Sequence, residues 1–197
     1  MKQIAACFVV GLVLASCGSA TGDSIAFTSD RDGDYDIFVM NADGTEVRQL
    51  TDNDDGYDGY AQWSPDGDSI TFDSDRDGDG EIFVMNADGT EVRQLTDNDD
   101  GDGYPRWSPD GDSIAFLSHR DGDNEIFVMN ADGTEVRQLT DNDDYDEFGV
   151  WSPDSDSIAF ASNRYGDYEI FVMNADGTGV FSTGQKGFPE DWGGPAD

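Results

Sequence analysis

The sequence has few cysteines, few basic side chains and one histidine. Cys7 and Cys17 are the only cysteines. Both lie in the N-terminal segment, so the remaining chain forms no disulfide and offers no thiolate nucleophile or cysteine metal site. Lys and Arg number 10 against 44 Asp and Glu, for a formal net charge of −34. Such a surface repels nucleic acids and anionic lipids, which excludes both as expected partners.

The N-terminal segment is typical of a signal peptide. Lys2 precedes an apolar run from Ile4 to Leu14, which is too short to span a membrane as a stable helix. The run ends in L-A-S-C, which resembles the lipobox of bacterial lipoproteins. The resemblance implies a signal peptide over residues 1–16, acylation of Cys17 and a short linker over 17–22. We expect an anchor at the outer membrane or cell surface, or secretion if the lipobox is not used.

One motif recurs through the rest of the chain at a fixed spacing. Trp63, Trp107 and Trp151 lie 44 residues apart, and each opens a copy of W-S-P-D-x-D-S-I-x-F. Each copy continues into I-F-V-M-N-A-D-G-T. Short apolar runs separated by turn residues at this period are typical of propeller blades. We expect a β-propeller domain over residues 23–197, with repeats starting near 23, 64, 108 and 152.

The second copy shows how one repeat is expected to fold. Its predicted strands are Ser69–Ser74, Glu81–Asn86 and Glu91–Thr96. The I-F-V-M run has no polar alternation, so both faces of that strand must be buried, as between two neighbouring blades. The tryptophans and the recurrent methionines are therefore predicted to pack in the core. These methionines are Met40, Met85, Met129 and Met173.

The two ends of the repeat array look complementary. The first copy begins at Ser24 with the second strand of a blade and has no W-S-P-D before it. The segment Gly187–Trp192 resembles Gly103–Trp107 with one residue inserted. We therefore predict an all-β fold of four four-stranded antiparallel blades, in which the C-terminal strand pairs with the first blade and closes the ring. The alternatives are an eight-bladed ring shared by two chains, or strand exchange between chains.

The repeat resembles that of TolB-type propellers in its W-S-P-D-G-x-x-I-x-F and [DE]-I-F-V-M-N-A-D-G-T-x-V-x-x-L-T segments, over residues 23 to about 192. Propellers of that family more often have six or more blades. The α/β N-terminal domain of TolB is absent from this sequence. Binding of the peptidoglycan-associated lipoprotein is therefore not carried over.

Carboxylates recur at alternate positions in the loop between the second and third strands. Oxygen ligands at this spacing suit a hard cation such as Ca²⁺, although the glycine at the fourth position excludes an EF-hand. The alternative is that these residues shape turns and maintain solubility, with the recurrent arginine paired to them. The predicted Ca²⁺ ligands are Asp30, Asp32, Asp34, Asp36, Asp75, Asp77, Asp79, Glu81, Asp121, Asp123 and Glu125.

The inventory of catalytic residues is poor. His119 is the only histidine and occupies a variable loop position. The carboxylates recur in every copy without one distinct unequal pair. We therefore expect a non-enzymatic anchored scaffold for a protein or glycan partner, with membrane contact through the lipid anchor only. The alternatives are a self-assembling, homo-oligomeric surface or filament protein and, least favoured, a propeller hydrolase or lyase. The aromatics predicted for the partner surface are Tyr57, Tyr60, Tyr104, Tyr145 and Phe148.

Overall fold

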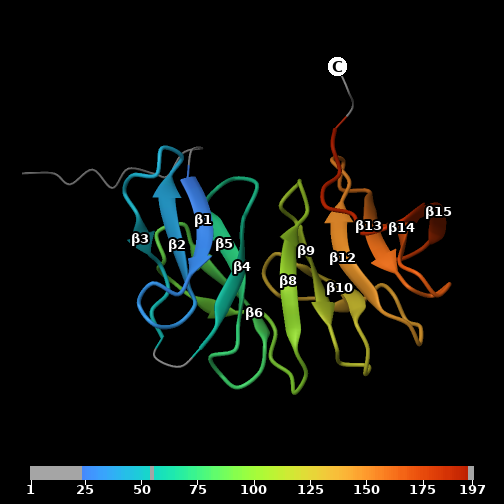
Figure 1. Cartoon of the computed structure of the whole chain (residues 1–197), viewed down its shortest axis with the longest axis horizontal. Helices are drawn as coiled ribbons and strands as arrows, with labels where there is room; N and C mark the ends of the chain where they lie inside the picture. The colour runs from blue at the N-terminus through green and yellow to red at the C-terminus, as the bar shows by residue number, and fades with distance from the viewer. Residues whose placement is uncertain (1–23, 54–55, 195–197) are drawn as a thin grey trace, which may run out of the picture.

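The computed structural model describes residues 24–53 and 56–194, which form strands and turns. Fifteen strands build four antiparallel sheets that follow one another along the chain (Figure 1). The predicted signal peptide, Cys17 and the linker lie outside the described residues. Within these residues, no helix is long and apolar enough to cross a membrane. The prediction of four antiparallel blades is confirmed.

The strand bounds repeat from blade to blade. The first blade holds β1 (Ser24–Ser29), β2 (Asp36–Asn41) and β3 (Arg48–Gln49). The second holds β4 (Asp58–Trp63), β5 (Ser69–Ser74), β6 (Glu81–Asn86) and β7 (Arg93–Gln94). The third holds β8 (Asp102–Trp107), β9 (Ser113–Ser118), β10 (Glu125–Asn130) and β11 (Arg137–Gln138). The fourth holds β12 (Asp146–Trp151), β13 (Ser157–Ser162), β14 (Glu169–Asn174) and β15 (Phe181–Lys186).

The outer strand β7 is shorter than the sequence predicts. It covers Arg93–Gln94 rather than Glu91–Thr96, because Glu91 takes a positive φ of 54° in the turn before it. Beyond the strand, the hydroxyl of Thr96 accepts a hydrogen bond of 2.9 Å from the amide of Ile82. The Leu95 amide also donates a hydrogen bond of 2.7 Å to the Ile82 carbonyl, so backbone and side chain together continue the attachment beyond β7.

The hydrophobic core is divided among the three junctions between blades. Ile37 and Val39 of the first blade pack with Ile70 and Phe72 of the second. The second and third blades, and the third and fourth, share similar clusters. Met85, Met129 and Met173 are fully buried, and the tryptophans contact the same clusters. The predicted core roles of the methionines and tryptophans are confirmed at these positions.

The first strand of each complete blade lies at the inner edge of the array. Strand β4 contacts β8, and β8 contacts β12, whereas β3, β7 and β11 contact only their own blades. The first and last blades stand at opposite ends of the line of four blades (Figure 1). Their strands do not contact each other.

The predicted ring closure is not seen in the described part of the chain. Residues 187–194 form no strand, and β1 pairs with β2 alone. The outer strand β15 runs on to Lys186, which pairs with Glu169 at the start of β14. The chain is therefore held on the fourth blade, and the inner position of the first blade has no strand from the described residues.

The turn in the fourth copy keeps its shape without the usual glycine. Ser155 has a φ of +63°, which is strained for a residue with a Cβ and costs about 1 kcal/mol. Its hydroxyl accepts a hydrogen bond of 3.1 Å from the amide of Asp110 on the preceding blade. This contact between blades offsets part of the strain.

Candidate functional site

A β-bulge recurs near the start of each inner strand. The pairing of β4 with β5 shifts register between Gly59 and Gln62, and the strands β8 and β12 have the same irregularity. In each bulge one aromatic residue has a positive φ: Tyr60 at 50°, Tyr104 at 57° and Phe148 at 59°. Bulges re-aim side chains, and such backbone strain concentrates at functional sites.

The bulges bring aromatic rings from successive blades into one continuous row. The ring centroids of Tyr60 and Tyr104 are 4.1 Å apart, and their hydroxyls are joined by a hydrogen bond of 3.1 Å. Tyr104 meets Phe148 at 5.9 Å, and Phe148 meets Phe188 at 5.5 Å. Tyr57 extends the row beside Tyr60 at 6.4 Å. We call these five residues, Tyr57, Tyr60, Tyr104, Phe148 and Phe188, the aromatic row.

The aromatic row is largely open to solvent. Tyr60 and Phe188 are each 45% exposed, and Phe148 is 37% exposed. The hydrogen bond with Tyr60, together with burial, raises the pKa of Tyr104 to about 12, so its phenol stays neutral. The row therefore offers uncharged stacking surface along the inner edge of an otherwise acidic molecule.

Behind the row, the second blade carries one buried carboxyl that the other blades lack. Asp73 is 7% exposed, and Leu117 and Ala161 stand at its place in the next two blades. Burial, together with the charges of neighbouring carboxylates, raises the pKa of Asp73 to about 6, although the Tyr104 amide donates a hydrogen bond that lowers it. The effect of the buried Asp73 carboxyl can therefore be judged against Leu117 and Ala161, the apolar residues at the same position of the next two blades.

The predicted Ca²⁺ ligands divide into two groups. The ligands Asp30, Asp32, Asp34, Asp75, Asp77, Asp79, Asp121 and Asp123 lie in the hairpin loops and are exposed or partly exposed. Asp36, Glu81 and Glu125 instead begin a strand and are 1% exposed. Within residues 24–53 and 56–194, no group of three or more acidic, histidine or cysteine side chains has an arrangement suited to holding a metal ion. Calcium binding stays a prediction.

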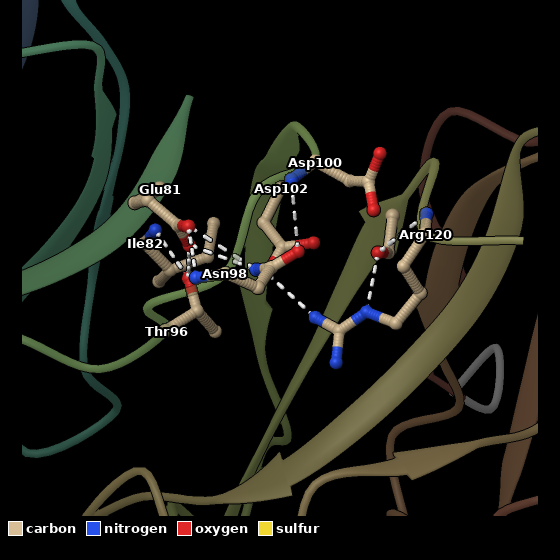
Figure 2. A network of polar contacts seen from close by, with 8 residues as sticks. Glu81, Ile82, Thr96, Asn98, Asp100, Asp102 and Arg120 are labelled. Atoms are coloured by element: carbon tan, nitrogen blue, oxygen red, sulfur yellow. Dashed lines mark hydrogen bonds and ion pairs between the residues drawn. The ribbon is translucent and has the colours of Figure 1, made fainter. Parts of the chain in front are cut away.

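The buried carboxylates form a polar network at each link between blades. Figure 2 shows the network between the second and third blades. Glu81 accepts a hydrogen bond from the hydroxyl of Thr96 and one of 2.8 Å from the amide of Asn98. The Asn98 side chain donates to Asp102 at 2.9 Å, and Arg120 approaches the same oxygen of Asp102 at 2.7 Å. The link is thereby tied to both blades.

The same links hold acidic groups that titrate near neutrality. Burial, together with the charges of Asp102 and Asp79, raises the pKa of Glu81 to about 7. Burial and the charges of Asp146 and Asp123 raise the pKa of Glu125 to about 7 in the next link. Glu81 and Glu125 each accept a hydrogen bond from the amide of an asparagine in the link that follows, whereas His119 is exposed on its hairpin loop.

The recurrent arginines have different partners from those that the sequence suggested. Arg76, Arg120 and Arg164 do not pair with the aspartates of their own loops. Each instead forms an ion pair of 2.7–2.9 Å with the first residue of its inner strand: Asp58, Asp102 and Asp146. Those three aspartates are fully buried. The pairing joins the hairpin loop to the inner strand within one blade, which spacing along the sequence does not reveal.

Most of the aromatic residues predicted for the partner surface lie next to one another in the structure. Four of the five predicted aromatics, Tyr57, Tyr60, Tyr104 and Phe148, lie in the row. Tyr145 is 47% exposed but has no ring contact with the row in the described part of the chain. The predicted set of aromatics omitted Phe188, although the likeness of Gly187-Phe188-Pro189 to Gly103-Tyr104-Pro105 was the available indication. It also missed Tyr168, whose ring lies 4.7 Å from that of Phe188.

Comparisons with solved structures agree with this architecture. A TolB-type protein from Agrobacterium tumefaciens is 30% identical with a TM-score of 0.73, and the match covers 83% of this chain and 62% of that one. TolB from Acinetobacter baumannii is 24% identical with a TM-score of 0.70, covering 84% of this chain and 42% of that one. This chain thus spans less than two thirds of either protein.

More distant similarity shows the fold alone. An oligogalacturonate lyase from Vibrio parahaemolyticus is 13% identical with a TM-score of 0.67, covering 81% of this chain and 49% of that one. None of the curated proteins compared with the chain matches it. The sequence profile of the TolB beta propeller domain matches residues 3–104 and 100–188. The chain therefore belongs to the TolB β-propeller domain family.

Proposed function

We propose that this protein is a non-enzymatic scaffold of the cell envelope that binds a protein partner along the aromatic row. The observation that carries the proposal is the repeated bulge, which holds Tyr60, Tyr104 and Phe148 at positive φ, with Tyr60 and Phe148 exposed and Tyr104 partly buried between them. Tyr104 also packs against the core between the third and fourth blades, but the exposed rings of Tyr60 and Phe148 make the recurrent strained conformation better explained by an outside partner. Membership in the TolB family supports a role in protein interaction.

The chemistry of the row defines the partner. Tyrosine is enriched at interfaces because it combines a large apolar ring with a polar tip. The surrounding formal charge of −34 favours a partner segment with basic as well as aromatic or apolar side chains. The proposal includes anchorage through an acylated Cys17 and Ca²⁺ bound among the hairpin-loop carboxylates. The lipobox resemblance supports the anchor, and the alternate acidic spacing supports the cation.

The test is site-specific photocrosslinking of the full chain in its native cells. A benzophenone amino acid is placed at Tyr60 or Phe148 and, as the control, at Tyr165, which is 73% exposed but outside the row. We expect the two row positions to crosslink the same protein and Tyr165 not to do so. Adding Tyr104→Asn should abolish the crosslink, because asparagine tolerates positive φ but removes the ring.

A crosslink pattern shared equally by the row and the control would refute the proposal. So would crosslinks to glycan only at the row positions, or a crosslink that Tyr104→Asn leaves unchanged. The anchor is tested separately, by mass spectrometry of the processed N-terminus. We expect an acylated Cys17, and we expect Cys17→Ser to release the protein from the membrane fraction.

A further inference from the structure

We propose that the free edge of β1 binds an extended strand from another protein and that this strand completes the first blade. The strand carries a carboxylate, an aromatic ring two residues later and a tryptophan three residues after that. This is the pattern of Asp58, Tyr60 and Trp63 in the second blade. The inference goes beyond the proposed function, because it concerns a backbone edge rather than the aromatic row as a whole.

Within residues 24–53 and 56–194, the first blade is one strand short at its inner edge. Its order is β1-β2-β3. In each of the other three sheets, an inner strand (β4, β8 or β12) pairs with the strand equivalent to β1 on the side that faces away from the equivalent of β2. The effect on burial is large. Ile25 of β1 is 43% exposed, while its counterparts Ile70, Ile114 and Ile158 are fully buried. In those blades, each of these isoleucines is paired with the tryptophan of the inner strand.

Arg31 is already held in the pose that its counterparts use to bind a carboxylate. Its Nε donates to the Ser29 hydroxyl at 3.1 Å, as Arg76 Nε does to Ser74 at 2.8 Å. Its guanidinium stacks on Phe38 at 4.5 Å, which matches the other blades. Arg76 uses the terminal nitrogen for a bidentate contact with Asp58. Among the described residues, Arg31 has no carboxylate partner.

A pocket lies where the missing strand would run. It has a volume of about 640 Å³ and is lined by Ala26, Phe27, Thr28, Tyr35, Tyr57, Tyr60 and Ala61. These residues come from β1, the hairpin loop beside it, the link before β4 and the strand β4 itself. An incoming aromatic ring would stack on Tyr60 as Tyr104 does in the next blade. Addition of an extended peptide to an exposed sheet edge is an established binding mode, with main-chain hydrogen bonds giving affinity and side-chain pockets giving specificity.

The register of the other blades fixes how the strand would lie. Asp58 faces Ser74, and Trp63 faces Ile70. By the same pairing, the incoming carboxylate faces Ser29 beside Arg31, and the incoming tryptophan covers Ile25. The three chemical groups of the partner thus each meet a residue that the first blade leaves uncovered.

The described residues of this chain do not supply that strand. The three inner strands with the pattern are paired within their own blades. In the segment after β15, Phe188 would be the aromatic, and Lys186 then stands where the carboxylate is needed. A lysine facing Arg31 is repulsive, and Lys186 already forms an ion pair of 2.5 Å with Asp167. A strand with an acidic residue from another protein fits the edge better than the C-terminus of a second copy.

The test uses the full chain and a fluorescein-labelled peptide that copies residues 102–111, D-G-Y-P-R-W-S-P-D-G. Fluorescence anisotropy should show saturable binding to wild type. We expect Arg31→Gln to weaken binding about tenfold, as for loss of a charge-assisted bidentate contact. Replacing the first Asp of the peptide by Asn should weaken binding to wild type similarly. The control Arg48→Gln removes an arginine from the outer strand of the same blade and should change nothing.

Hydrogen exchange supplies the second measurement. The β1 amides that point away from β2 should exchange rapidly in the free chain and become protected when the peptide is added, whereas the alternate amides that donate to β2 should be protected in both states. The inference is overturned if the peptide does not bind, or if Arg31→Gln binds it as wild type does. It is equally overturned if the β1 amides that point away from β2 are already protected in the free chain, whether by another part of the same chain in a monomer or by a second copy in a dimer detected by sedimentation.

Discussion

Replacing Asp73 by alanine, the residue at the same position of the fourth blade, is expected to stabilise the protein at neutral pH. Asp73 is buried, and its pKa rises from the ordinary value of 3.8 to about 6. A shift of this size corresponds to a destabilisation of about 3 kcal/mol when the group is ionised. The alanine loses the hydrogen bond from the Tyr104 amide, which is worth about 1 kcal/mol. The net gain is about 2 kcal/mol.

The sign of the pH dependence follows from the direction of the shift. The folded chain holds the Asp73 proton up to about pH 6, whereas the unfolded chain releases it near 3.8. Between these values the folded state binds more protons, so wild type loses stability as pH rises and reaches the full penalty above pH 6. Asp73→Ala should therefore gain most above pH 7 and lose its advantage below pH 4.

The assay is thermal unfolding of wild type and Asp73→Ala at pH 7.5 and pH 4, compared at equal salt. A gain of about 2 kcal/mol raises Tm by roughly 4–8 °C for a chain of this size. Asp68→Ala, a change at an exposed position in the turn before β5, serves as the control for removing one negative charge. A destabilised Asp73→Ala at pH 7.5, or an equal gain at both pH values, would refute the reasoning.

Further predictions concern the buried ion pair of a link, an exposed ion pair that serves as its control, and calcium binding in the loops. Asp102→Ala leaves the Arg120 guanidinium without its buried partner and should lower the free energy of unfolding by about 3 kcal/mol, which chemical denaturation would show. Lys186→Ala, which breaks only an exposed pair, should leave the midpoint unchanged. Calcium at about ten times a weak dissociation constant should add roughly 1.4 kcal/mol per site. Thermal melting with calcium or with chelator, at matched high ionic strength, measures this, and equal midpoints would remove the calcium prediction.

The strands and the core were predictable because they depend on short periods along the chain. The I-F-V-M run of β6 and β10 has no polar position, so burial between two blades followed from pattern alone. The 44-residue spacing of Trp63, Trp107 and Trp151 predicted the repeated blades for the same reason. The outer strand was predicted too long, because the positive φ of Glu91 is a property of the turn geometry and not of residue preference.

The candidate site was predictable only as a set of aromatic residues. Nothing in the composition of Gly59-Tyr60 or Glu147-Phe148 indicates a bulge with a positive φ at the aromatic. The row exists because equivalent rings from successive blades face the same inner edge. Contacts such as the bond between Tyr60 and Tyr104 join residues 44 positions apart, beyond the reach of local pattern.

The sequence by itself determined that this protein is a propeller of repeated blades with a strongly acidic surface and an apolar core between blades. Those properties are fixed by period and composition. Only the tertiary structure decided which carboxylate each arginine binds, that Ser155 is compensated by Asp110, and that the inner position of the first blade lacks a strand from the described residues. Each of these depends on how neighbouring blades are placed, because electrostatic pairing and strand addition act through space between residues far apart in the chain.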